Sequence, residues 1–354
     1  MPSPQFRLNT EGRAPEEIGP ARADAITEAL EKLLGTPDEP NVPEGVPLKI
    51  GQLRAAAGPV GSHSDGSDSD GSRTGLYRRH CVRCHGLSGD GAGPAAAMLN
   101  PYPRDFRRGI FKYTSTNAGA KPSRKDIKRT LLKGVPGTAM PSFVRLSQND
   151  LDALVEYVKY LSIRGEAELY LLRLVVDEDE YLPLHELAAA ALEEGLLPAA
   201  ALWESARSAV VTPPPEPPTD APQSPASSVA KGRELYAQKD AQCVKCHGPN
   251  GEGDGEDAEL YDDWNKPKEG VTPEQTAKLA RLFTLPIQQL RPRNFHQGTY
   301  RGGDEPVDLY WRIHVGIKGT PMPAAGPAPG AAGVLAPEEI WHMVHYLQSL
   351  SQAE

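Results

Sequence analysis

The sequence predicts a mostly α-helical chain built from two repeated units. Five short landmarks occur in the same order in residues 73–165 and in residues 229–354. Each of these ranges closes with a stretch whose apolar residues recur at the period of a helix. Residues 166–212, rich in Leu, Ala and Glu, also have a helical pattern. No run of about 18 or more apolar residues occurs, so no segment is predicted to span a membrane.

Residues 1–72 form an N-terminal extension with one predicted helix. Apolar residues recur on one face from Ala21 to Leu34, and Gly35 and Pro37 then end the helix. The extension finishes in a Ser-, Asp- and Gly-rich stretch at 62–72. This stretch is too polar to bury anything, so we expect a mobile loop.

The two repeated units share a Gly-to-Tyr segment, a Cys-x-x-Cys-His-Gly motif, a Pro-Arg-x-Phe segment, a Gly-Thr-x-Met-Pro loop and a final helix. In the first unit these are Gly75-Leu-Tyr77, Cys81-Val-Arg-Cys-His85-Gly, Pro103-Arg-Asp-Phe-Arg-Arg-Gly109, Gly137-Thr-Ala-Met140-Pro and Leu151–Leu161. In the second they are Gly232-Arg-Glu-Leu-Tyr236, Cys243-Val-Lys-Cys-His247-Gly, Pro292-Arg-Asn-Phe-His-Gln-Gly298, Gly319-Thr-Pro-Met322-Pro and Glu338–Leu350. Five landmarks in the same order indicate a duplication.

Residues 166–228 connect the two units. The helical pattern of 166–212 is followed by the proline-rich stretch Thr212–Ser228. Proline-rich chains favour extended conformations, so this stretch is predicted to be a semi-stiff spacer.

Charge is distributed unevenly along the chain. Residues 73–164 hold 17 Lys/Arg and 6 Asp/Glu, whereas residues 165–227 hold 2 and 12, and residues 1–72 hold 6 and 12. Opposite charges attract at close range, so the acidic extension or connector is expected to lie over the basic unit. The alternative is that the basic face stays open for an acidic partner.

All four cysteines occur in two Cys-x-x-Cys-His strings, at Cys81, Cys84 and His85 and at Cys243, Cys246 and His247. This spacing places two thiols about one helical turn apart, where both can add to the vinyl groups of one haem, with the adjacent imidazole beneath the iron. A single Cys₄ zinc site would leave both histidines unexplained. A thioredoxin-like site needs a βαβ context that the sequence lacks.

At these residues the sequence resembles the cytochrome c family, with one monohaem-type domain in 73–165 and another in 229–354. The resemblance implies an all-α fold for each domain, with N-terminal and C-terminal helices that cross near the haem. It also implies two covalently bound haem c groups, one at each motif. At the crossings, the glycines Gly75 and Gly232 are expected to allow close approach to Tyr157 and Tyr346.

The resemblance further implies that Met140 and Met322, in the Gly-Thr-x-Met-Pro loops, are axial ligands opposite His85 and His247. The proline after each methionine lacks an N–H donor and restricts the chain there. Met98 is the reserve candidate for the first haem. The other candidate, Met343, falls at a core position of the last helix and is expected to be a packing residue.

Arg104 and Arg293 lie in the repeated Pro-Arg-x-Phe segments. A guanidinium can hold a carboxylate with two hydrogen bonds, so both are candidates to bind haem propionates. The alternative for each is a solvated loop arginine. Phe106 and Phe295 are expected to pack at the haem edge, and His80 is the spare ligand candidate beside the first motif.

His/Met ligation fills both axial positions of an iron, which suits electron transfer and disfavours turnover. The sequence therefore favours an electron carrier between respiratory redox proteins, with no nucleic-acid partner, and leaves open that it is a subunit of a larger redox complex. The alternative is a dihaem cytochrome c peroxidase, which needs one haem with an openable iron.

A periplasmic or otherwise extracytoplasmic location is expected, because bacteria attach haem c outside the cytoplasm. The chain opens without a charged n-region or an apolar h-region. The expectation is therefore that a targeting segment precedes Met1, and such a segment is the one route considered for tethering to a membrane.

Overall fold

A computed structural model of the chain describes residues 4–58, 75–178, 182–218, 227–267 and 285–351, except for positions 12, 14 and 258. It also describes positions 270, 272, 274 and 275. The predicted polar loop at 62–72 lies outside the described residues. Within the described part of the chain the structure is helical, and extended pairing is limited to isolated bridges. The all-α prediction is therefore confirmed.

The structure divides into two compact units, which differ from the two sequence repeats because each unit is made of three separate segments of the chain. The first comprises residues 1–110, 144–205 and 267–286, and the second comprises residues 111–143, 206–266 and 287–354. Each unit is described by itself below.

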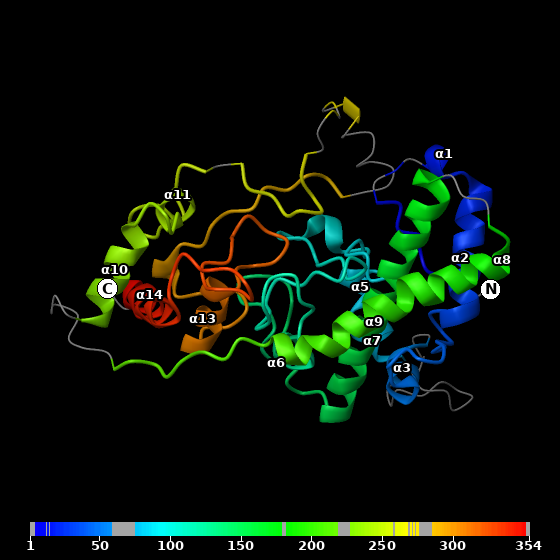
Figure 1. The fold of residues 1–354 in the computed structure, drawn as a ribbon, viewed down its shortest axis with the longest axis horizontal. Helices are drawn as coiled ribbons and strands as arrows, with labels where there is room; N and C mark the ends of the chain where they lie inside the picture. The colour runs from blue at the N-terminus through cyan, green and yellow to red at the C-terminus, as the bar shows by residue number, and fades with distance from the viewer. Residues whose placement is uncertain are drawn as a thin grey trace. The chain divides into compact units, whose positions relative to one another are not determined.

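In the first unit, the described part of the N-terminal extension contains the helices α1 (Pro15–Ile18), α2 (Pro20–Leu34) and α3 (Ile50–Ala56). The bounds of α2 confirm the helix predicted at Ala21–Leu34. Its buried face consists of Ile26, Ala29, Leu30 and Leu34, which recur three or four residues apart. α2 lies beside α8, and α3 packs against α7 (Figure 1).

The long helix α7 runs from Gln148 to Leu172. The end predicted from the sequence, Leu161, is wrong. Gly165 does not break the helix, because it is buried where a Cβ atom would collide with the backbone of Arg107. The closing helix of the first repeat therefore continues into the connector without interruption.

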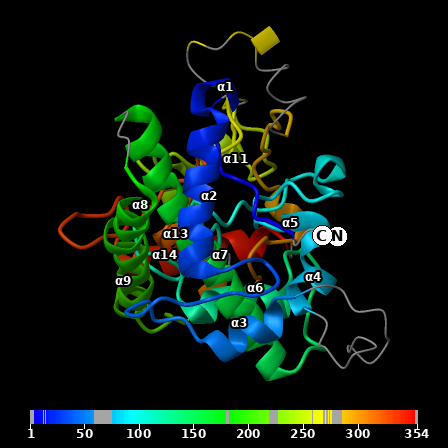
Figure 2. The same ribbon diagram turned by 90° about the vertical axis from the view of Figure 1, so that its right-hand side faces the viewer.

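The connector folds as helices, as its pattern predicts. α7 passes into the π-helical turn η2 (Arg173–Asp177), and α8 (Leu184–Ala190), the π-helical turn η3 (Ala191–Leu196) and α9 (Leu197–Ser205) follow in succession. η3 packs against α7 at Gly195, where a Cβ atom would lie 2.9 Å from the Cβ of Ala167. The absent side chain thus lets the two helices approach closely. Figure 2 shows α8 and α9, the two helices that η3 joins.

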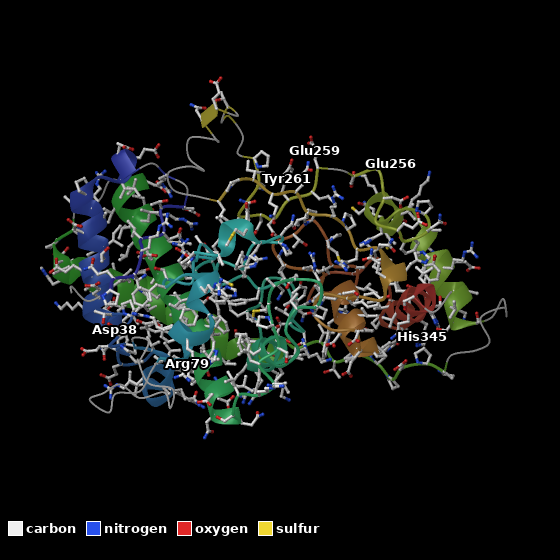
Figure 3. The ribbon with its side chains drawn as sticks, turned by 180° about the vertical axis from the view of Figure 1, so that it is seen from behind. Asp38, Arg79, Glu256, Glu259, Tyr261 and His345 are labelled. Atoms are coloured by element: carbon white, nitrogen blue, oxygen red, sulfur yellow. The ribbon has the colours of Figure 1, made fainter. Side chains whose placement is uncertain are left out.

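Ion pairs join both acidic segments to the basic repeat inside this unit. Arg78 in the helix α4 (Leu76–His80) pairs with Asp38 of the extension at 2.6 Å. Figure 3 labels Asp38 and Arg79, the residue that follows Arg78. Lys159 on α7 pairs with Glu204 of the connector at 2.8 Å. Parts of the extension and connector therefore lie over the basic repeat, which favours the first of the two interpretations of the charge pattern.

In the second unit, α10 (Ser228–Ala237) crosses α14 (Pro337–Leu350). A Cβ atom on Gly232 would collide with the carbonyl oxygen of His342, so this glycine is required at the crossing. The prediction is confirmed for Gly232. For Gly75 the atoms nearest to an added Cβ would be backbone atoms of Gly58 and Ala57, so the close approach of this glycine to Tyr157 stays a prediction.

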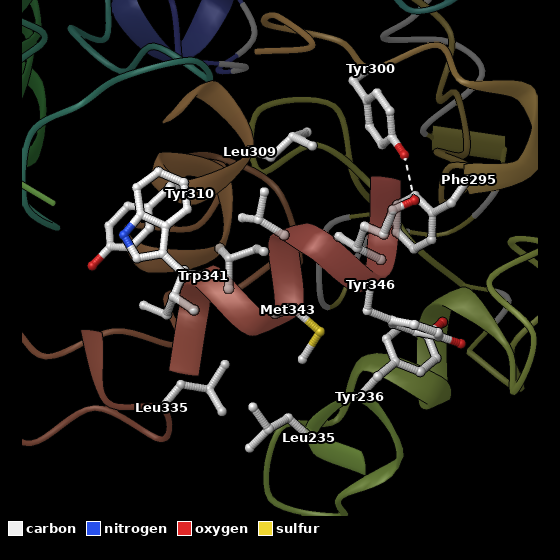
Figure 4. Packing of buried hydrophobic residues seen from close by; sticks show 14 of the residues in the cluster. Leu235, Tyr236, Phe295, Tyr300, Leu309, Tyr310, Leu335, Trp341, Met343 and Tyr346 are labelled. Carbon is white, nitrogen blue, oxygen red and sulfur yellow. Dashed lines mark hydrogen bonds between the residues drawn. The ribbon is translucent and has the colours of Figure 1, made fainter. Parts of the chain in front are cut away.

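The core of the second unit forms around α14. Ile340, Met343, Val344 and Leu347 face Leu235 and Tyr236 of α10 on one side and residues of α13 (Pro306–His314) on the other (Figure 4). Met343 is 1% exposed, which confirms that it is a packing residue. Full burial of one such side chain stabilises the fold by about 1.5–3 kcal/mol.

The second unit also holds residues 111–143, which belong to the first sequence repeat. Its helix α6 (Arg124–Lys133) begins at a capping box of Ser123 and Asp126. Lys133 Nζ lies 3.0 Å from both Asp308 Oδ2 and Glu305 Oε1. These ion pairs fasten α6 to the start of α13.

Residues 211–216, which we call the strap, run extended over α13 and α14. Trp311 donates its indole N–H to the carbonyl of Val211 at 3.0 Å, and Trp341 donates to that of Pro214 at 2.9 Å. The two acceptors are three residues apart, which is one turn of a polyproline II helix. His345 Nε2 lies 3.0 Å from Glu216 at the end of the strap. The strap, which is part of the predicted spacer, is therefore extended, and these hydrogen bonds fix its position along α13 and α14.

None of the helices in the described ranges has the length and apolar character that spanning a lipid bilayer requires.

Candidate functional site

Each Cys-x-x-Cys-His motif folds into a single helical turn. The first forms α5 (Val82–His85), with Cys81 at its N-terminus, and the second forms α11 (Cys243–His247). No disulfide joins any of the four cysteines. Burial raises the pKa of Cys81 to about 12 and that of Cys243 to about 11. Before a haem is attached, both side chains would therefore be neutral thiols at pH 7.

The two histidines that end the motifs are held in the same way. His85 Nδ1 lies 3.1 Å from the carbonyl oxygen of Arg104, and His247 Nδ1 lies 3.2 Å from that of Arg293. A carbonyl can only accept, so Nδ1 carries the proton and donates it. The lone pair of each ring is then on Nε2, where it can bind a metal.

An aromatic ring also packs against each histidine. Phe106 stacks on His85 and Phe295 stacks on His247, both with ring centroids 4.5 Å apart. Burial lowers the pKa of His85 to about 4 and also lowers that of His247. Both imidazoles are therefore neutral at pH 7, the form that ligates iron.

A glycine-rich turn follows each histidine, and sequence analysis missed most of it. Glycines at the same offsets adopt positive φ in both halves: Gly86, Gly89 and Gly91 in the first, and Gly248, Gly251 and Gly253 in the second. The Tyr77 hydroxyl donates to the carbonyl of Gly86 at 3.0 Å, and the Tyr236 hydroxyl to that of Gly248 at 2.7 Å. The signal was present in the repeated Gly-x-x-Gly-x-Gly spacing.

The two Gly-Thr-x-Met-Pro loops also share one conformation. Thr138 donates its hydroxyl to the carbonyl of Val135 at 2.8 Å and accepts from the backbone N–H of Met140 at 3.1 Å. Thr320 makes the same two bonds, to Ile317 at 2.7 Å and from Met322 at 3.3 Å. The threonine thus fixes the backbone just before each methionine.

The other candidate ligands occupy different environments. Met140 and Met322 are half-buried, whereas the side chain of Met98 is 78% exposed on the 3₁₀ turn η1 (Ala96–Met98). Met98 therefore has no enclosed position from which to ligate a buried metal. His80 ends α4 and is half-buried, and burial lowers its pKa.

The two units divide the predicted site residues between them. The first unit holds Cys81, Cys84, His85 and Arg104, and the second holds Cys243, Cys246, His247, Arg293, Met322 and Met140. Of the two predicted sets, the second lies entirely within one unit.

Arg293 has a cationic neighbour that sequence analysis did not single out. The Nε atoms of Arg293 and Arg301 are both buried and have no hydrogen-bond partner. Burial and the charge of Arg301 lower the pKa of Arg293. Two arginines close together with unsatisfied nitrogens suit an anionic group such as a carboxylate.

This set of groups fits a covalently attached haem. It provides paired thiols for the vinyl groups, a neutral imidazole with a free Nε2, a thioether on a fixed loop and, in the second half, cations for the propionates. It does not fit a zinc site, because the described residues contain no cluster of three His, Cys, Asp or Glu side chains suited to a metal ion.

Comparison with known proteins is consistent with this fit. The family model for cytochrome c matches residues 74–162 and 229–351, which together exceed half of the chain. Among solved structures, a chain of the Kuenenia stuttgartiensis reducing HAO-like protein complex Kustc0457/Kustc0458 is similar, with a TM-score of 0.50 and 26% sequence identity. The match covers 78% of the present chain and 93% of that chain. No curated protein matches.

Proposed function

Because the chain belongs to the cytochrome c family, with one domain in each half, we propose that it is a dihaem electron-transfer protein. One haem c is attached at Cys81 and Cys84 and the other at Cys243 and Cys246. The axial pairs are His85 with Met140 and His247 with Met322. The observation that carries the proposal is that both halves repeat the same histidine anchor and the same methionine loop.

When bound, haem supplies an iron that takes up and releases one electron. The residues of the chain hold that iron in a constant environment. The carbonyls of Arg104 and Arg293 fix the imidazole orientation, and the threonines fix the loops before the methionines. Rigid axial ligands change little between the two oxidation states, and this favours rapid electron exchange.

A dihaem peroxidase is the alternative. A peroxidase needs one iron that opens to peroxide, with acid and base groups beside it. The equal hydrogen bonding of the two methionine loops supports two closed sites instead. The similarity to a chain of the HAO-like protein complex supports a role as the electron-transferring subunit of an assembly with redox partners. We further propose an extracytoplasmic location, where haem c is attached.

Three variants test the axial ligands. Met140→Ala and Met322→Ala are each expected to abolish the near-infrared Met–Fe(III) band of one haem and to open that iron to imidazole. Met98→Ala is the matched control, since its side chain is 78% exposed, and should leave both bands intact. The mass of the intact protein gives the number of haems independently.

Peroxide turnover distinguishes the two functions. The wild type is expected to show both Met–Fe(III) bands in the oxidised state and little peroxidase activity. A high-spin or bis-histidine haem in the resting protein, together with rapid peroxide consumption, would replace the carrier assignment with the peroxidase.

A further inference from the structure

The strap and the two residues after it present one face of a polyproline II helix to α13 and α14. This helix has three residues per turn, so residues three apart lie on the same face. The residues on one face are buried or half-buried: Val211, Pro214 and Pro217. The residues one position later in each turn are exposed: Thr212, Pro215 and Pro218. Burial along this segment therefore has the period of a polyproline II helix.

The prolines of the strap decide how it can be bound. Residues 213–215 are all proline and have no backbone N–H, so this stretch offers only carbonyl acceptors. A site that holds it must supply donors, and an indole N–H is a donor that accepts nothing. Trp311 and Trp341 donate to the carbonyls of Val211 and Pro214 at 3.0 and 2.9 Å. The spacing of the two donors thus matches one turn of the strap.

Both indoles are positioned by contacts that do not involve the strap. Trp341 is 4% exposed, and the centroid of its ring lies 4.8 Å from that of Tyr310. The guanidinium carbon of Arg129 lies 4.6 Å from the centroid of the Trp311 ring. The two donors therefore keep their spacing through the packing of α13 and α14 themselves.

A third contact binds the carboxylate at the end of the strap. His345 lies one helical turn after Trp341 on α14, with Nε2 3.0 Å from Glu216 Oε1. Ser228 Oγ lies 2.6 Å from Nδ1 of the same ring and restrains its orientation. All of these groups belong to the second unit. The site thus reads two carbonyls and one acidic side chain.

We propose that Trp311, Trp341 and His345 form a recognition site for a proline-rich segment in the polyproline II conformation, with a carboxylate two residues after its second bound carbonyl. The ligand is the strap of this chain. Such a segment is extended before it binds, so ordering it costs little, and aromatic side chains are the usual receptors for it. Because the strap is tethered, its effective concentration is on the order of millimolar, and it fills the site. The inference does not depend on either haem.

Hydrogen exchange of the indole N–H groups, followed by magnetic resonance of the reduced intact protein, tests whether the site reads one face of the strap. Pro214→Ala and Pro215→Ala each remove one proline, but only Pro214 lies on the contacting face. We expect Pro214→Ala to speed exchange at Trp341 about tenfold and Pro215→Ala less than about twofold. The signal of Trp203, in the first unit, is the internal reference. Equal effects of the two variants would overturn the inference.

A synthetic peptide with the sequence of residues 209–218 tests recognition in trans. In the intact protein, the combined changes Pro213→Gly, Pro214→Gly and Pro215→Gly weaken the strap and leave the site unchanged. Calorimetry should show that this variant binds the peptide at least about tenfold more tightly than the wild type, whose site is filled.

Two changes then test the donors and the histidine. Trp341→Phe, added to the glycine variant, keeps an aromatic ring and removes the N–H, so it should weaken peptide binding about fivefold. A peptide with Glu216→Gln should bind about threefold more weakly. Absence of binding to a folded glycine variant, or equal affinity after Trp341→Phe, would overturn the inference. If the glycine variant is unfolded, the exchange rates of the two alanine variants decide alone.

Discussion

Replacement of Gly232 by alanine tests whether the helix crossing in the second unit limits its stability. A methyl group there would collide with the carbonyl oxygen of His342, a backbone atom of α14 that cannot rotate away. Relief requires α10 and α14 to separate. Separation would also disturb the contact of Tyr236 with Tyr346, whose ring centroids lie 5.4 Å apart.

The expected size of the effect combines two opposing terms. Alanine is favoured over glycine inside a helix by about 1 kcal/mol. Insertion of a methyl group into a tightly packed place costs about 1–3 kcal/mol, and a fixed backbone atom puts this case at the upper end. We therefore expect Gly232→Ala to lower the free energy of unfolding by about 2 kcal/mol.

Gly51 provides the control for this experiment. It lies in α3, where a Cβ atom would meet nothing within 4 Å, so Gly51→Ala should raise the free energy of unfolding by about 0.5 kcal/mol. Guanidinium unfolding followed by both far-ultraviolet circular dichroism and haem absorbance separates transitions of the two units. A Gly232→Ala protein as stable as the wild type would refute the close-packed crossing.

Two further predictions concern charges in the second unit. Burial lowers the pKa of Lys318 from 10.5 to about 8, so between these pH values the native protein binds fewer protons than the unfolded chain. The free energy of unfolding should therefore rise with pH from 8 to 10.5 in the wild type relative to Lys318→Met, and parallel pH profiles would contradict this. Asp308→Asn removes the charge of a buried carboxylate that pairs with Lys133 and Arg129, and it should cost about 3 kcal/mol in denaturant unfolding. Glu305→Gln, at an exposed carboxylate, should cost less than about 1 kcal/mol, and equal losses would be inconsistent with a buried clamp.

Elements with a strong apolar period were predicted well from the sequence. The helix expected at Ala21–Leu34 spans Pro20–Leu34, and the one expected at Glu338–Leu350 spans Pro337–Leu350. In both, the end signals are local, such as the glycine after Leu34. The end of α7 was predicted wrongly, because the reason for a glycine inside the helix is not local. Gly165 leaves room for the backbone of Arg107, which is far away in the sequence.

Residues of the candidate site were predictable where the same motif occurs in both sequence repeats. The motif cysteines and histidines, and the methionine loops, were found in this way, and they remain predictions as haem ligands. The contact of Arg293 with Gly137 could not be predicted, because it depends on how residues 111–143 fold onto the second repeat. Arg301 lies outside the repeated landmarks, so the repeat gave no signal for it. No periodicity or local motif encodes that arrangement.

Because α7 is uninterrupted, it limits where residues can be inserted into or deleted from this chain. Each residue of an α-helix advances the side-chain direction by about 100°. A single residue inserted after Arg164 would therefore turn every later side chain of the helix, among them the buried Leu171 and Leu172, away from its present neighbours. Insertions and deletions should therefore be tolerated poorly within α7 and within the continuous run of α8, η3 and α9, because in both the phase of the helix governs which residues meet.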